Sequence, residues 1–183
     1  AADWAINCRV VTNWNYNSFS VLLLSDVYRV TGDRKYLEAA KRKTRLGVLP
    51  GQLSTGPRRG RWFDPHNARP AYHYIMVRGL AALAAVLPPD DADLPPLIEC
   101  LRFALSARNP DFEKGIINAD STVEALVRVK AVPPYVAEGL TGCQTDEALA
   151  TLERYAAAGF RAKKMPLGPG AWGQLLKYST EQQ

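Results

Sequence analysis

The chain has 183 residues, of which 47% are hydrophobic and 22% are charged. This composition is typical of a soluble globular protein and argues against a disordered chain. The length is sufficient for one well-buried core and short for two, so we expect a single domain. Lys and Arg total 23 against 18 Asp and Glu, and the resulting net charge of +5 favours anionic partners.

The sequence disfavours membrane-spanning, disulfide-stabilised and zinc-binding proteins. The longest apolar run, 75–87, contains Arg78 and is too short and too polar for a membrane span. Cys8, Cys100 and Cys143 lack paired spacing, which disfavours a disulfide framework and a zinc site. We therefore expect no metal and no cofactor, and the sequence assigns no compartment. The start of the chain, which has no basic-then-apolar leader, is expected to be a processed end or a cut inside a longer polypeptide.

Helical periodicity dominates the first part of the chain. Apolar residues recur at helical spacing over 17–30, among them Phe19, and predict an amphipathic helix. Gly32 fits the left-handed position after a helix end, and Asp33 is a typical N-cap for a second helix over 34–46. A tight turn between two such helices predicts an αα-hairpin.

A loop rich in Gly and Pro is expected over 47–69, and a loop of this length is commonly functional. The next helix, 71–87, is apolar on nearly all sides and should be central. The helix after that one, 94–107, is expected to be stopped by Asn109-Pro110. Helices are predicted over 94–107, 122–129, 134–139, 145–158 and 171–178. The fold class predicted is all-α, a single domain of successive antiparallel helical hairpins.

The segment 60–78 combines aromatic, imidazole, amide and guanidinium groups where a polar loop enters an apolar helix, a common place for a site. In a sugar site, Trp62 would stack on a pyranose ring, and Arg69 or Arg78 would pair with a carboxylate. The candidate catalytic residues are His73, Tyr72 and His66, and the candidate substrate-binding residues here are Trp62, Asp64, Asn67, Arg69 and Arg78.

A structural interpretation of the same segment is equally concrete. Asp64 or Asn67 would cap the helix and Pro70 would occupy its first turn. Trp62 would fill a gap against the core, and His73 would be a hydrogen-bonded interior histidine. Both interpretations remain open at the level of sequence.

A second cluster, 13–17, alternates three Asn with two aromatic residues. Trp14 could serve as a platform for a sugar, and the amide of Asn15 could bond its hydroxyl groups. Alternatively, these residues cap and staple the first helix. If both clusters meet in space, a binding site is favoured, because two unrelated caps have no reason to converge.

The run 27–40, in which Tyr precedes Thr-Gly-Asp and Tyr-Leu follows it, resembles the hairpin turn of six-hairpin, or α/α-toroid, carbohydrate-active proteins. These include glycoside hydrolases, epimerases and polysaccharide lyases, and the resemblance covers roughly the first half of the chain. A complete toroid needs about twice this length, so the resemblance implies an arc or a subdomain. For toroidal lyases it further implies Asn and Arg that neutralise a uronate carboxylate, and Tyr or His that removes the C5 proton.

The function predicted is therefore binding or processing of a carbohydrate, with an acidic glycan and lyase-like proton abstraction as the specific hypothesis. The alternative is a non-catalytic helical scaffold or protein-interaction domain, which could contact the remainder of a larger protein. Hydrolysis is disfavoured because Asp64 is the single acid in the dense segment. Nucleic-acid binding is disfavoured because the basic runs 41–45 and 58–61 are more typical of a solvated surface.

Overall fold

The computed structural model describes residues 1–63, 69–113, 119–146, 148 and 150. Apart from one isolated bridge between Gln52 and Trp62, the regular structure of these residues is helical, which confirms the all-α class. The helices are α1 (Ala2–Asn7), α2 (Trp14–Thr31), α3 (Arg34–Gly47), the 3-10 turn η1 (Leu49–Gly51), α4 (Pro70–Ala84), α5 (Leu94–Ser106), α6 (Asn109–Glu113), α7 (Ala119–Lys130) and α8 (Pro134–Gly139). The helices predicted over 145–158 and 171–178 lie largely or entirely outside the described residues.

The first predicted hairpin is confirmed. Gly32 follows α2 with a φ of 69°, a left-handed conformation that glycine adopts without a steric penalty. The side chain of Asp33 then accepts a hydrogen bond from the backbone N–H of Lys35 at 3.1 Å and so caps α3. Local backbone chemistry is sufficient to reverse the chain here.

The prediction for Asn109-Pro110 is only partly right. Helix α5 ends before it, at Ser106, but the dipeptide then begins the short helix α6. Proline is tolerated in the first turn of a helix because the N–H that it lacks has no partner within the helix.

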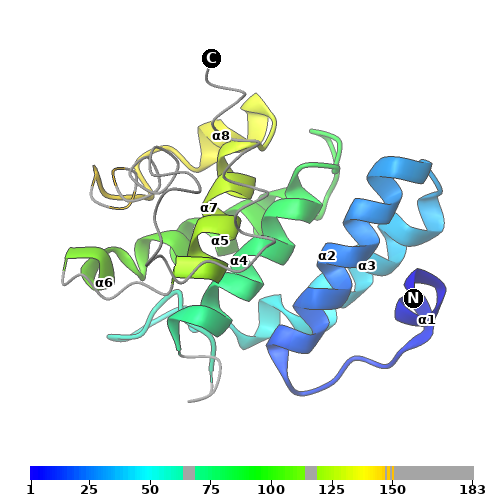
Figure 1. The fold of residues 1–183 in the computed structure, drawn as a ribbon, viewed down its shortest axis with the longest axis horizontal. Coiled ribbons are helices and arrows are strands. Elements are labelled where there is room, and N and C mark those ends of the chain that lie inside the picture. The colour runs from blue at the N-terminus through cyan, green and yellow to red at the C-terminus, as the bar shows by residue number, and fades with distance from the viewer. Residues whose placement is uncertain (64–68, 114–118, 147, 149, 151–183) are drawn as a thin grey trace, which may run out of the picture.

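The helices form two layers, with α4 at the centre (Figure 1). Helix α2 packs beside α4 and α4 packs beside α7, while α3 packs on α2 and α5 packs on α4. The buried apolar residues of α4 include Met76, Val77, Leu80 and Leu83, so the prediction that this helix is central is confirmed. No helix in the described part of the chain has the length and apolar character that crossing a membrane requires.

Close contact between α2 and α4 depends on small residues. The hydroxyl of Ser18 donates to the carbonyl oxygen of Ile75 at 3.0 Å, and a Cβ on Gly79 would overlap Ser18. Figure 1 shows both helices beginning at the same end of the molecule, where the chain that follows α3 also lies. The two polar clusters predicted from the sequence are therefore carried to one end of the fold.

Candidate functional site

The two predicted clusters meet at the end where α2 and α4 begin. The indole N–H of Trp14 donates to the carbonyl oxygen of Phe63 at 3.0 Å, across 49 positions of the sequence. The ring of Trp14 also lies directly over Gly51, where a Cβ would overlap it. The two segments therefore meet in space, which is the condition that favours a binding site, and Trp14 remains only partly buried.

Trp62 does not serve the role predicted for it. Its side chain is completely buried, and its indole N–H donates to the carbonyl oxygen of Val48 at 2.8 Å. The chain turns back on itself here, with the N–H of Leu53 bonded to the carbonyl of Arg61 at 2.8 Å, and this turn directs the indole into the core. A ring in this position cannot stack on a sugar, so the structural interpretation of Trp62 is correct.

His73 is also an interior residue. It has no exposed surface, and its Nε2 lies 2.8 Å from the carbonyl oxygen of Ala104. Because a carbonyl can only accept, Nε2 carries the proton and Nδ1 holds a lone pair. Burial, reinforced by the positive charge of Arg108, holds the pKa of His73 well below its ordinary value of 6.5. The imidazole is neutral and sealed from solvent, so the prediction that it exchanges a proton with a substrate is wrong.

Arg78 already has partners within the fold. Its guanidinium group pairs with the carboxylate of Glu124 on α7 and lies 5.3 Å from the ring centre of Phe19 on α2. The side chain is only 13% exposed. These contacts join three helices, so the assignment of Arg78 to a substrate carboxylate is not supported.

Other predicted residues do face the surface. Arg69, directly before α4, is exposed, and its guanidinium carbon lies 5.8 Å from the ring centre of the half-buried Tyr72. Phe63, which had no predicted role, is 68% exposed beside its bond to Trp14. Asp64, His66 and Asn67 lie outside the described residues.

Asn15 is the most unusual predicted residue. Its side chain is 1% exposed, and among the described residues neither its amide nitrogen nor its amide oxygen has a hydrogen-bond partner. Residues three apart share a helix face, and Ser18 contacts α4, so Asn15 lies on the side of α2 that faces α4. Buried amides without partners are rare in folded proteins and frequently mark functional positions.

Asn17, two residues later, shows what a structural asparagine looks like here. Its amide group donates to the carbonyls of Val11 and Gly47, both at 2.8 Å, and its oxygen accepts from the N–H of Val11 at 3.1 Å. Asn17 therefore holds the chain before α2 against the end of α3, whereas Asn15 makes no such contribution.

Two further features were not predicted. Arg108 is 2% exposed and binds Asp111 at 2.7 Å, and Arg61 lies 3.6 Å from the same carboxylate. The Arg-x-x-Asp spacing was a signal for the first of these pairs.

Among the described residues, no group of three or more metal-ligating side chains could hold a metal ion.

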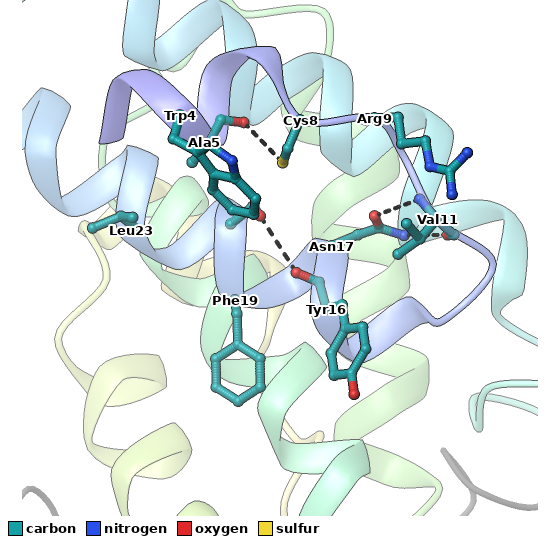
Figure 2. A pocket seen from close by; sticks show the side chains of 10 residues that line it. Trp4, Ala5, Cys8, Arg9, Val11, Tyr16, Asn17, Phe19 and Leu23 are labelled. Atoms are coloured by element: carbon teal, nitrogen blue, oxygen red, sulfur yellow. Dashed lines mark hydrogen bonds between the residues drawn. The ribbon is translucent and has the colours of Figure 1, made fainter. Parts of the chain in front are cut away.

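The second unpredicted feature is an apolar groove of about 480 Å³ between α1 and the first half of α2 (Figure 2). Trp4, Tyr16 and Phe19 line it with rings that are 72%, 62% and 44% exposed. The sequence pattern placed Phe19 on the apolar face of its helix, but that face extends beyond the core. The signal available was the unusual density of aromatic residues between Trp4 and Phe19.

No known protein family, curated protein or solved structure matches this chain.

Proposed function

We propose that this domain binds an acidic carbohydrate at the end of the fold where α2 and α4 begin. The observation that carries the proposal is the contact between Trp14 and Phe63, which joins the two clusters selected from the sequence. Trp14 is partly accessible, Phe63 and Arg69 are exposed, and Tyr72 is half-buried. Aromatic faces with a few fixed polar groups are the usual elements of a small-ligand site.

Charge supports an acidic ligand. Arg69 has no carboxylate partner in the described part of the chain, in contrast to Arg78. A guanidinium group recognises a carboxylate through two parallel hydrogen bonds, as a uronic acid would require. The amide of Asn15, which is buried and has no hydrogen-bond partner among the described residues, supports a polar ligand at the same end.

The packing of α2, α4 and α7 supports an arc of an α/α toroid. In such an arrangement alternate helices are neighbours in one layer, and the intervening helices form the other. The contacts of α2 with α4 and of α4 with α7, with α3 packed on α2 and α5 packed on α4, fit that order. The toroid arrangement is part of the proposal.

A lyase-like reaction is the catalytic form of this proposal. Arg69 would neutralise the uronate carboxylate, which makes the adjacent C5 proton more acidic. Tyr72 is the described candidate that could contact this proton, since His73 is sealed in the core.

Titration calorimetry with uronic-acid oligosaccharides and with neutral oligosaccharides of equal length tests the proposal. Binding should favour the acidic ligand, and Trp14→Ala and Arg69→Ala should each weaken it at least about tenfold, or about 1.4 kcal/mol. Arg34→Ala, which removes an exposed guanidinium from α3, is the matched control. Equal affinity for both ligands, or equal effects of Arg34→Ala and Arg69→Ala, would contradict the assignment.

The catalytic form of the proposal is tested separately. The lyase reaction should form an unsaturated product that is followed by ultraviolet absorbance, and Tyr72→Phe should abolish its formation.

A non-catalytic scaffold is the second candidate. It is favoured by the bonds of Trp62 and His73 to the backbone carbonyls of Val48 and Ala104. This alternative predicts that the wild-type protein binds neither oligosaccharide in the same titrations.

A further inference from the structure

Cys8 lies beside a buried lysine. Lys43, on α3, has no exposed surface, and its Nζ lies 2.8 Å from the carbonyl oxygen of Cys8 and 3.1 Å from its Sγ. Cys8 itself is only half-buried. A cation next to a partly accessible sulfur is the arrangement found around nucleophilic cysteines.

The same cysteine lines the apolar groove between α1 and α2. Figure 2 shows Cys8 between Ala5 and Arg9, with the side chains of Trp4 and Leu23 on one side and Arg9 on the other. The volume of about 480 Å³ is within the range of small-molecule sites. A partly accessible thiol and an apolar groove therefore share one wall.

We propose that Cys8 is a site of covalent modification by a long-chain acyl group, whose hydrocarbon chain occupies the groove. The apolar residues Trp4, Phe19 and Leu23 offer a surface for the chain. Arg9, an exposed cation at the groove, complements the negative charge carried by acyl donors such as acyl-coenzyme A. The positive charge of Arg9 and the apolar surface of the groove thus favour an acyl donor that is both anionic and amphipathic.

The reaction is an exchange of thioesters. The Cys8 thiol loses its proton to solvent, and its sulfur attacks the carbonyl carbon of the acyl donor. A new carbon–sulfur bond forms as the bond to the donor sulfur breaks, and the donor thiolate leaves and takes a proton from solvent. No oxidant or reductant is required. The Nζ of Lys43, 3.1 Å from the sulfur, donates a hydrogen bond to it.

The other two cysteines provide an internal comparison. Cys100 and Cys143 are each 5% exposed, and burial raises the pKa of both thiols. Neither lines the α1–α2 groove. Modification that depends on this environment should therefore discriminate strongly between Cys8 and these two residues.

Intact-mass spectrometry of the full chain incubated with palmitoyl-coenzyme A tests the proposal. We expect one acyl adduct, mapped to Cys8, released by hydroxylamine, absent in Cys8→Ser and retained in Cys100→Ser. Acetyl-coenzyme A, which presents the same thioester without the long chain, should react at least tenfold more slowly. A distribution of adducts over all three cysteines, or equal rates for the two donors, would overturn the proposal.

Two variants separate the charge from the groove. Lys43→Met should slow alkylation of Cys8 by iodoacetamide at least tenfold. Phe19→Asp changes a partly exposed ring, so it should slow palmitoylation while leaving alkylation by the small reagent unchanged. Circular dichroism verifies that each variant is folded. If Lys43→Met does not fold, the result for Phe19→Asp tests the proposal. Unchanged palmitoylation of folded Phe19→Asp would remove the groove from the reaction.

Discussion

The rings of Trp62 and His73 pack edge to face, with centroids 5.3 Å apart and planes inclined by 72°. Each ring also donates a hydrogen bond to a distant carbonyl, Trp62 to Val48 and His73 to Ala104. The pair thereby connects the chain after α3, the start of α4 and the end of α5. These rings stabilise the end of the fold on which the proposed carbohydrate site is built.

The first prediction concerns pH. Burial holds the pKa of His73 well below 6.5, so below that pH the unfolded chain binds a proton that the folded chain does not. The free energy of unfolding is therefore independent of this group above pH 6.5. It falls by about 1.4 kcal/mol for each pH unit below 6.5. Urea unfolding between pH 7.5 and 5.5 measures this slope. His73→Gln removes the titrating group and should reduce this slope by about 1.4 kcal/mol per pH unit. An unchanged slope in a folded variant would contradict the assignment.

The second prediction compares two asparagines of α2. Asn15→Leu removes a buried amide that has no partner in the described part of the chain, and it should stabilise the fold by about 1 kcal/mol. Asn17→Leu leaves the carbonyls of Val11 and Gly47 unpaired and should destabilise it by about 3 kcal/mol. Denaturant unfolding of both variants measures the difference. A similar loss of stability in both would mean that Asn15 has partners in solution.

The third prediction compares two glycines with positive φ, Gly56 at 76° and Gly60 at 84°. A Cβ on Gly56 meets open space, whereas one on Gly60 would overlap the carbonyl oxygen of Phe103 on α5. Gly56→Ala should cost about 1 kcal/mol for the backbone conformation alone. Gly60→Ala should cost about 3 kcal/mol, because the loop must also move away from α5. Thermal unfolding should rank the variants in this order, and equal costs would exclude the contact.

The fourth prediction concerns the buried ion pair of Arg108 and Asp111, at 2.7 Å. Asp111→Asn would leave the Arg108 side chain, which is only 2% exposed, without this carboxylate, at a cost of about 3 kcal/mol. Arg29, whose side chain is 56% exposed and pairs with Asp26, provides the surface comparison. Arg29→Met should change the free energy of unfolding by less than about 0.5 kcal/mol. If Asp111→Asn and Arg29→Met changed the free energy of unfolding equally in denaturant unfolding, burial would not make the Arg108–Asp111 pair more important than a surface pair.

Features set by neighbours along the chain were predictable. The left-handed turn at Gly32 and the cap at Asp33 depend on a few adjacent residues, and both are observed. Apolar spacing likewise identified α4 as central, because a helix that is apolar on nearly all sides must be covered by others. The convergence of the Trp14 and Trp62 segments was a conditional expectation, since it required α2 and α4 to begin at the same end.

What the sequence by itself determined is the helical class and the position of the first hairpin, because these follow from periodicity and local backbone preference. Only the tertiary structure decided which polar and aromatic groups face water. Trp62 and His73 are buried because carbonyls 14 and 31 positions away accept their hydrogen bonds. Trp4 and Phe19 are exposed although apolar, since no described element covers α1 and α2 on that side. Burial is a property of packing between distant segments, and no local pattern encodes it.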